Sequence, residues 1–172
     1  SLDAFRQGVP CTTKVEWIAD QQAHPPYGTN LTFPMASYVR CHQTSGTTGA
    51  PMRWLDTAES WHAMLEAWDC VYAAAGASSE DRAFFAFSFG PFLGFWTAFE
   101  SAQKRGMFCL SGGGMTTETR IKALVDHQCS ILCCTPTYAL RLAQVAAEQG
   151  LHGKDFALRA IIVAGEPGGS LP

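Results

Sequence analysis

The sequence predicts an α/β fold, with a largely parallel β-sheet and helices on both faces. From residue 82 onward, short apolar runs alternate with longer segments whose apolar residues recur at helical spacing. The short runs are apolar throughout, which is typical of strands that a parallel sheet buries on both faces. With 172 residues, of which 47% are hydrophobic, the chain is long and apolar enough to bury a core.

The first part of the chain, residues 1–40, is expected to be irregular and partly helical, and the α/β part is expected at 41–172. Prolines interrupt the first part repeatedly. Thr12 and Thr13 precede the run KVEWIAD, which predicts a short helix that begins at a threonine cap.

A long helix is predicted next. Asp56 and Glu59 have the spacing of a capping box, with Asp in place of the usual Ser or Thr. The apolar residues that follow have helical spacing and are interpreted as core, and Gly76 is a natural end for the helix. These residues are Trp61, Met64, Leu65, Trp68, Val71, Tyr72 and Ala75.

Strands and helices then alternate along the rest of the chain. Strands are predicted at 82–89, 106–110, 130–134 and 158–165, and helices at 92–105, 117–127 and 137–149. Ligands of such sheets bind beyond the carboxyl ends of the strands. The loops SFGPF, CTPTY and AGEPGG occupy such positions, so we expect them to form the binding site. Because AGEPGG lies so near the last residue, we also expect the chain to be part of a longer protein.

Charge and composition argue against several classes of partner. The net charge of −3 gives no electrostatic reason to expect nucleic acid or an anionic membrane surface. No apolar run is long enough to cross a bilayer, and residues 1–10 lack the apolar core of a signal peptide. A cytoplasmic protein is therefore expected. Aromatic residues are plentiful while only 16% of residues are charged, which suggests a surface that something covers; a homodimer is left open.

Seven cysteines raise the question of a metal site or disulfides. Most lie in apolar runs such as MFCL and ILCC, and no two form a C-x-x-C pair. Cysteine in such runs behaves as a small hydrophobic residue, so we expect buried free thiols in a reducing compartment and no metal site. The cysteines are Cys11, Cys41, Cys70, Cys109, Cys129, Cys133 and Cys134.

The stretch TSGTTGAP at 44–51 has the chemistry of an anion-binding loop. Its glycines let backbone N–H groups approach phosphate oxygens closely, and its hydroxyls add further donors. It is not a Walker A loop, because Gly46 and Gly49 are too close together and no lysine follows them. A generic hydroxyl-rich turn is the alternative.

TSGTTGAP resembles the phosphate-binding loop of the adenylate-forming acyl-CoA synthetases, and its context resembles the phenylacetate–coenzyme A ligase branch of that superfamily. Further segments resemble that branch in the same order along nearly the whole chain. They are PCTTKVEW, YVRCHQ with Arg40 and His42, FSFGPFLG, SGGGMTTETRIKALVDH, CTPTYALRLA and AGEPGG. The resemblance implies a partial N-terminal domain of an adenylate-forming enzyme.

The resemblance also implies an AMP-forming carboxylate–CoA ligase, with ATP, Mg²⁺ and coenzyme A as cofactors or substrates. A carboxylate similar to phenylacetate would attack the α-phosphate of ATP, and the thiol of coenzyme A would then displace AMP. The β- and γ-phosphates would be held by Thr44, Ser45, Gly46, Thr47, Thr48 and Gly49. The family's ribose-binding acid and C-terminal lysine cannot be assigned, so the chain alone is expected to have no ligase activity.

An acyl pocket and a loop beside the adenine follow from the same resemblance. The pocket residues are Phe87, Phe89, Gly90, Phe92 and Tyr138, and the loop residues are Ala164, Gly165, Glu166 and Pro167. The family often has tyrosine at the positions of Phe87 and Phe89, so phenylalanine would make the pocket drier. Plain core packing of Phe87, Phe92 and Tyr138 is the alternative interpretation.

Several residues depart from the family pattern or allow two interpretations. Many relatives have lysine at the position of Ala50, and Arg53 could replace that contact or simply lie at the surface. The family's tryptophan after Glu-Pro is Gly168. His42 could orient the loop, stabilise the adenylate as a catalytic residue, or be held structurally. The glycines at 112–114 lack a G-x-G-x-x-G frame, which favours a tight connection over a second phosphate site.

Two other functions are kept as alternatives to a ligase fragment. One is a standalone nucleotide-binding or interaction domain without ligase activity. The other is a nucleotide hydrolase or kinase with an unusual loop, against which the absent Walker lysine argues.

Overall fold

The structure is a computed structural model that describes residues 2–9, 11–44 and 49–168. The chain divides into two compact units, one up to Ser60 and the other from Trp61 onward. Strands at 38–43 and 53–57 form a hairpin that bonds to a helix near the N-terminus, and the functional division at position 40 stays a prediction.

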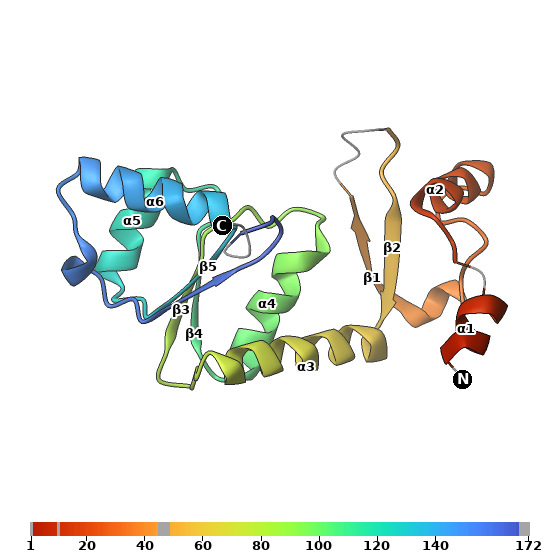
Figure 1. Ribbon diagram of the computed structural model, residues 1–172, viewed down its shortest axis with the longest axis horizontal. Helices are drawn as coiled ribbons and strands as arrows, with labels where there is room; N and C mark the ends of the chain where they lie inside the picture. Colours follow the sequence, from red (N-terminus) through yellow and green to blue (C-terminus); the bar gives the residue numbers. More distant parts are fainter. Residues whose placement is uncertain (1, 10, 45–48, 169–172) are drawn as a thin grey trace. The chain divides into compact units, whose positions relative to one another are not determined.

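The first unit consists of short helices and one hairpin (Figure 1). Its elements are α1 (Leu2–Gly8), α2 (Lys14–Ala23), the 3-10 helix η1 (Met35–Ser37), β1 (Tyr38–Gln43) and β2 (Arg53–Thr57). The predicted threonine cap of α2 is confirmed. The Thr13 hydroxyl accepts from the N–H of Glu16, and the Glu16 carboxylate accepts from the N–H of Thr13.

The hairpin was not predicted, and α2 is bonded to it. β1 and β2 pair antiparallel. The side-chain amide of Gln21 bonds the backbone of Arg53 twice: Nε2 donates to the carbonyl at 2.8 Å, and Oε1 accepts from the N–H at 2.9 Å. Trp17 also stacks on Trp54, with ring centroids 5.1 Å apart. These contacts make α2 and the hairpin one packed body.

The start of α3 (Ala58–Ala74) differs from the prediction. Asp56 lies in β2, and the cap is made by Thr57, whose hydroxyl accepts from the N–H of Ser60 at 3.1 Å. Asp56 accepts instead from the Ser60 hydroxyl at 3.0 Å. The predicted capping box of Asp56 and Glu59 is therefore wrong, because β2 runs to Thr57 and leads directly into the helix.

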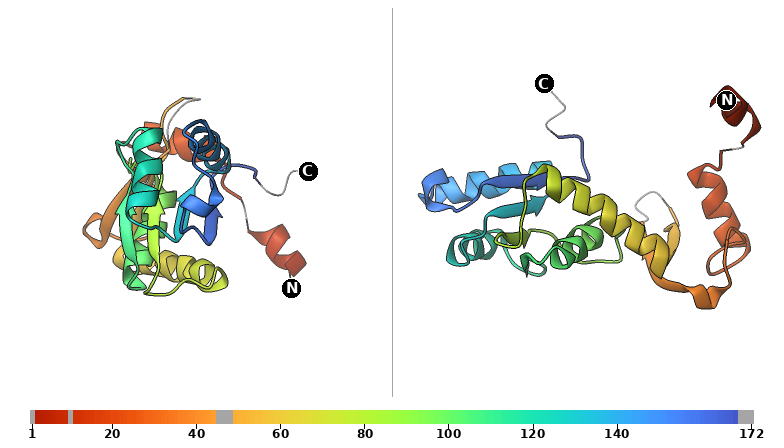
Figure 2. Two further views of the ribbon diagram at one scale, coloured as in Figure 1. Left: turned by 90° about the vertical axis from the view of Figure 1, so that its left-hand side faces the viewer. Right: turned by 90° about the horizontal axis from the view of Figure 1, so that it is seen from below.

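The second unit is a four-stranded parallel sheet flanked by helices, as predicted (Figures 1 and 2). Its strands are β3 (Arg82–Phe85), β4 (Phe108–Ser111), β5 (Ile131–Cys134) and β6 (Ala160–Val163), in the spatial order β4-β3-β5-β6. Its helices are α3 from Trp61 onward, α4 (Leu93–Lys104), α5 (Thr117–Asp126), α6 (Pro136–Glu148) and the 3-10 helix η2 (Gly153–Asp155). Each neighbouring pair of strands is parallel.

Alternate side chains of the strands enter two cores, one on each face of the sheet. Phe85 packs in a cluster with Tyr72 of α3 and with residues of α4. Its neighbour Phe84 packs in the other cluster, with Ile121 of α5 and Leu142 of α6. Neither phenylalanine has any exposed surface. Helices therefore cover both faces, which explains why the strands are apolar throughout.

β3 is shorter than predicted. The N–H of Ala86 still bonds the carbonyl of Cys133 at 2.9 Å, but the N–H of Phe87 turns back to the carbonyl of Phe85 at 3.0 Å. The strand consequently ends at Phe85, and the residues after Ala86 begin a loop.

A polar cluster joins the amino ends of β3, β5 and β6. Asp81 accepts from the Ser130 hydroxyl at 2.7 Å and from Arg159 Nε at 2.9 Å. Arg159 also donates to the carbonyls of Ala75 and Gly76. The Asp81 side chain is 7% exposed. Its hydrogen bonds, those from Arg159 above all, lower the pKa of the Asp81 carboxyl well below its usual range.

The cysteines are free, but only some of them are buried. Cys129, Cys133 and Cys134 are buried, Cys109 is intermediate, and Cys11, Cys41 and Cys70 are exposed. Burial raises the pKa of the Cys133 thiol to about 12. Buried thiols are thus confirmed for the sheet, and the expectation is wrong for the exposed cysteines. In the described part of the chain, no helix is both long and apolar enough to span a membrane.

Replacing Tyr72 by phenylalanine is expected to lower the free energy of unfolding by about 1 kcal/mol. The Tyr72 side chain is fully buried, and its hydroxyl donates to the carbonyl of Ala98 at 2.7 Å. Thermal unfolding of the full-length protein measures the effect. The half-buried Tyr27, in the first unit, is the control position for the same substitution. Equal stability of the Tyr72→Phe variant and wild type would contradict the prediction.

Candidate functional site

The TSGTTG segment connects the two strands of the hairpin. The N–H of Thr44 donates to the carbonyl of Met52 at 2.9 Å, and the Thr44 hydroxyl accepts from the N–H of Met52 at 3.0 Å. Ser45, Gly46, Thr47 and Thr48 lie outside the described residues. Thr44 and Met52, one on each side of that stretch, are therefore bonded to each other twice.

Gly49 has a backbone conformation that requires glycine. Its φ angle is +148°, in a region that residues with a side chain rarely adopt. No heavy atom lies within 4 Å of the place that a Cβ would occupy. The requirement for glycine therefore comes from the backbone angle and not from lack of space.

His42 is buried inside the first unit. It lies opposite Trp54 in the hairpin and is 5% exposed. Its Nδ1 is 3.8 Å from Oδ2 of Asp56, whose side chain is also buried. This placement supports the interpretation in which His42 is held structurally. A catalytic contact of His42 with the adenylate stays a prediction.

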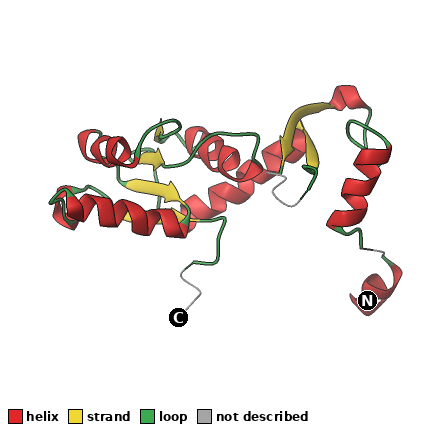
Figure 3. Ribbon diagram, turned by 90° about the horizontal axis from the view of Figure 1, so that it is seen from above, coloured by secondary structure: helices red, strands yellow, loops and turns green. Residues whose placement is uncertain are grey.

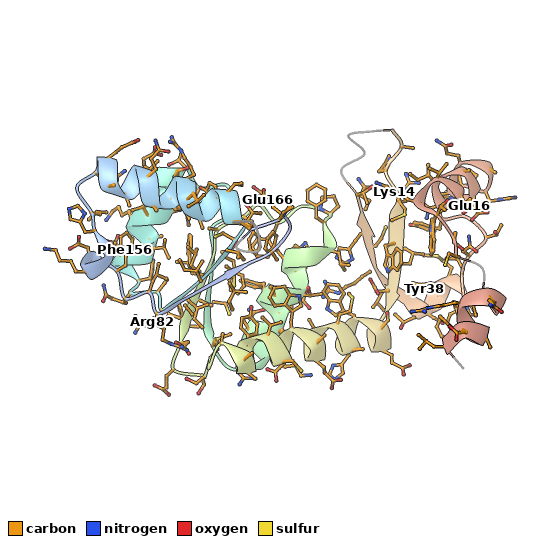
Figure 4. The ribbon with its side chains drawn as sticks, in the orientation of Figure 1. Lys14, Glu16, Tyr38, Arg82, Phe156 and Glu166 are labelled. Atoms are coloured by element: carbon orange, nitrogen blue, oxygen red, sulfur yellow. The ribbon has the colours of Figure 1, made fainter. Side chains whose placement is uncertain are left out.

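In the second unit, loops follow the strands at one edge of the sheet (Figure 3). Residues 86–92 follow β3, residues 112–116 follow β4, and residues 164–168 follow β6, while β5 leads through Thr135 into α6. Figure 4 labels Glu166 at this edge and Arg82 at the opposite, amino edge. The predicted acyl and adenine residues lie on these segments.

The aromatic loop packs against α4. The Phe87 ring stacks on Phe95 with centroids 3.7 Å apart, and the Phe89 ring contacts Trp96 and Phe99 at 4.7 and 5.1 Å. Phe87 is only 8% exposed. The sequence analysis missed the three aromatic residues of α4, although their spacing in FLGFWTAF indicates a common helix face.

Gly90 and Phe92 form the outer part of the same loop. Trp96 Nε1 donates to the carbonyl of Gly90 at 2.8 Å. A Cβ on Gly90 would lie 2.9 Å from the Phe92 ring, so a side chain there would displace that ring. Phe92 itself is 47% exposed. Among the predicted pocket phenylalanines in the described structure, Phe92 is therefore the most accessible to a ligand.

The glycine segment is a tight connection that lies against the aromatic loop. The N–H of Gly112 donates to the carbonyl of Phe85 at 2.9 Å. A Cβ on Gly112 would lie 3.0 Å from that carbonyl oxygen, and one on Gly113 would lie 3.7 Å from the Phe89 ring. The close approach explains the glycine at 112, and the φ angle of +75° explains the glycine at 114, which supports a tight connection.

Arg120 of α5 lies beneath these loops, and the sequence analysis missed it. Its Nε donates to the carbonyl of Gly112 at 3.0 Å and its Nη1 to the carbonyl of Ala86 at 3.3 Å. Its guanidinium carbon is 5.0 Å from the centroid of the Tyr138 ring. The available signal was a charged residue directly beside Ile121 on the apolar face of the predicted helix.

Tyr138 lies on the other face of the sheet from Phe87. It packs against the cluster that contains Phe84, whereas Phe87 belongs to the cluster that contains Phe85. The Tyr138 hydroxyl is 3.1 Å from the Thr117 hydroxyl. The structure thus places the predicted pocket residues along one edge of the sheet but on both of its faces.

Glu166 is bound to the first turn of α6. Its Oε2 accepts from the hydroxyl of Thr137 at 2.6 Å and from the N–H of Thr137 at 3.2 Å. These hydrogen bonds, the one from the side chain first, lower the pKa of the Glu166 carboxyl. A carboxylate is favoured at the N-terminus of a helix, where backbone N–H groups lack partners. The contact fixes the loop of Ala164, Gly165 and Pro167 to the start of α6.

Comparison with known proteins shows the family. None of the known protein-family models matches the chain. The chain is 32% identical over 152 residues to a phenylacetate–coenzyme A ligase of Pseudomonas putida. The aligned region covers 86% of this chain and 34% of that relative. It is 31% identical over 163 residues to the phenylacetate–coenzyme A ligase of Escherichia coli K12. The aligned region covers 92% of this chain and 35% of that relative. The chain belongs to the phenylacetate–coenzyme A ligase family.

Solved structures similar to this member of the phenylacetate–coenzyme A ligase family include a CoA ligase. A 2-hydroxyisobutyryl-CoA ligase, solved in complex with 2-HIB-AMP and CoA, has a TM-score of 0.92 at 30% identity over 100% of this chain and 37% of its own. The N-terminal domain of FACL13 from Mycobacterium tuberculosis, at 20% identity and a TM-score of 0.60, is similar in fold. The chain spans about a third of the length of its curated relatives.

The structure accounts for one of the two departures from the phenylacetate–coenzyme A ligase pattern. A Cβ on Gly168 would lie 2.6 Å from the ring of Pro136, so tryptophan could not stand there without a shift of the loop. Arg53, considered as a replacement for the lysine lost at Ala50, donates from Nη1 to the carbonyl of Pro26 at 2.9 Å. This contact supports a structural role for Arg53, and its contact with phosphate stays a prediction.

Proposed function

We propose that the full-length protein is an AMP-forming carboxylate–CoA ligase that acts on an aryl or similarly apolar acid of the phenylacetate type. The observation that carries this proposal is the identity of 31–32% to curated phenylacetate–coenzyme A ligases over most of this chain. Support comes from the 2-hydroxyisobutyryl-CoA ligase structure with 2-HIB-AMP and CoA. We infer from that enzyme that this protein also forms an acyl-adenylate and uses coenzyme A.

The first half-reaction joins the acid to AMP. A carboxylate oxygen forms a bond to the α-phosphorus of ATP, and the bond to the bridging oxygen breaks to release pyrophosphate. Negative charge increases on the leaving group, so preorganised N–H and hydroxyl donors stabilise the transition state. In the first unit, residues 44–49 would supply these donors to the β- and γ-phosphates.

Mg²⁺ would enter this reaction as part of the ATP substrate. The described residues contain no group of three His, Cys, Asp or Glu side chains that could hold a metal ion. Mg²⁺ commonly keeps several waters and binds through substrate phosphates with few protein ligands. We therefore propose that magnesium enters together with the phosphates of ATP.

The second half-reaction forms the thioester. The sulfur of coenzyme A attacks the acyl carbonyl carbon, the bond to the phosphate oxygen breaks, and AMP leaves with the bonding electrons while the thiol proton passes to solvent. In the second unit, Phe92 and Tyr138 would contact the acyl group, with Phe87 and Phe89 behind it. The loop that Glu166 fixes to α6 would border the adenine.

We also propose the cytoplasm as the compartment and neither nucleic acid nor a membrane as a partner. The net charge of −3 supports the absence of a polyanionic partner. Whether the protein is a homodimer is decided by light scattering of the full-length protein.

The full-length protein is expected to release pyrophosphate from ATP only when an apolar carboxylic acid is present. Assays across a panel of aryl and alkyl acids measure this release, and addition of coenzyme A should yield AMP and a thioester. Formation of ADP and inorganic phosphate instead would support the hydrolase or kinase alternative. ATP binding without turnover for any acid would support a binding domain.

A further inference from the structure

Resting on the ligase function proposed above, we propose that Arg120 is a positioning residue that sets the shape of the acyl site. It holds three segments in place at the carboxyl edge of the sheet. They are the start of the aromatic loop at Ala86, the glycine segment at Gly112, and the first turn of α6 at Tyr138. Nothing in the proposed chemistry requires Arg120 to touch the substrate.

The contacts of Arg120 match the geometry of a guanidinium group. Nε and Nη1 donate to two carbonyls that belong to different loops, while the guanidinium carbon lies over the Tyr138 ring, 5.0 Å from its centroid. Only arginine combines several donors in one rigid plane with a face that stacks on a ring. A lysine could make one of these contacts at a time.

Among the described residues, the buried charge of Arg120 is compensated by two backbone carbonyls and by the Tyr138 ring. The residue is 8% exposed, and no ion pair found among the described residues includes it. A buried cation is costly unless hydrogen bonds or a π face compensate it. Displacement of any one of the three segments would weaken that compensation, so Arg120 stabilises one arrangement of the loops.

Each segment that Arg120 contacts contains, precedes or lies against a predicted acyl-site residue. Ala86 precedes Phe87, and the glycine segment lies against the Phe89 ring. The Tyr138 ring is held by Arg120 on one side and by the hydrogen bond of its hydroxyl with Thr117. A shift of Arg120 therefore moves both aromatic groups that flank the edge of the sheet.

The test compares Arg120→Lys and Arg120→Gln with wild type in the full-length enzyme. Arg82→Gln is the matched control. Arg82 also donates to a backbone carbonyl, that of His127 at 3.0 Å, but it lies at the amino end of β3. Steady-state kinetics with phenylacetate and with a longer arylalkanoate give kcat and KM for each acid and for ATP. Circular dichroism and thermal unfolding show whether each variant is folded.

Both Arg120 variants are expected to raise the KM for phenylacetate about tenfold, to change the preference between the two acids, and to leave the KM for ATP unchanged. The control should retain wild-type values. If Arg120→Gln does not fold, Arg120→Lys carries the test, and it should shift the preference between acids. Folded Arg120 variants with wild-type acid KM and preference would overturn the inference, even if they are less stable. Wild type without pyrophosphate release for any acid would refute the ligase function itself, and this inference with it.

Discussion

Replacing Gly49 by alanine is expected to lower kcat/KM for ATP in pyrophosphate release by about 100-fold in the full-length enzyme. The φ angle of Gly49 is +148°, which alanine adopts only with strain. The connection between the hairpin strands would relax to another path, and its donors would no longer match the phosphate oxygens. Initial rates at varied ATP concentration measure the loss.

The matched control for this variant is Gly150→Ala. Gly150 also has a positive φ angle, of +76°, and no heavy atom lies within 4 Å of its missing Cβ, but it ends α6. Each substitution should reduce stability by about 1 kcal/mol, and only the change at Gly49 should reduce the rate. Similar rates for the two variants would show that the connection does not hold the phosphates.

Replacing Asp81 by alanine is expected to lower the free energy of unfolding by about 2–3 kcal/mol. The substitution removes the acceptor of the Ser130 hydroxyl, the Ser78 N–H and Arg159 Nε, while the other nitrogens of Arg159 keep the carbonyls of Ala75 and Gly76. The Arg159 side chain is 42% exposed, so water compensates part of the loss, and the effect is smaller than for a fully buried pair. Thermal unfolding of the full-length protein, with the exposed neighbour Glu80→Ala as control, measures the difference.

The same carboxylate should make stability depend on acid pH. Because the folded-state pKa of Asp81 lies below the unfolded value of about 3.9, its stabilisation is fully present above that pH. It is lost as the pH falls from about 4 toward the folded pKa. Asp81→Asn should therefore lose less stability than wild type over this interval. Parallel curves for the two proteins would contradict the assignment.

The parallel sheet could be predicted because its signal is local. ILCC and AIIV are apolar throughout, and each precedes or follows a segment with helical spacing, so strands and helices are identified without knowledge of their partners. The hairpin gave no such signal, since YVRCHQ and RWLDT mix polar and apolar residues without strict alternation. Its strands are stabilised by distant contacts, Gln21 with Arg53 and Trp17 with Trp54. Sequence periodicity does not reveal such contacts between residues far apart in the chain.

The candidate site was predictable where chemistry determines residue type, and less so where packing does. A segment with four hydroxyls and two glycines favours an anion-binding loop over a generic hydroxyl-rich turn, and this stays a prediction. Phe87 and Tyr138, by contrast, are the same residue types that cores use, and they pack with different core clusters, one on each face of the sheet. Arg120 was missed because its partners are carbonyl oxygens and a ring, which no motif records. Roles of the individual site residues stay predictions.

The contacts of Arg120 and the polar cluster of Asp81 and Arg159 lie at opposite ends of the same short strands. They are roughly 10 Å or more apart along a strand of four residues. Substitutions at such distances usually have additive effects. Divergence among related genes could therefore remodel the loops around Arg120 toward new acids while the Asp81 end keeps the scaffold intact. In this way substitutions that change substrate specificity would have little effect on the stability of the fold.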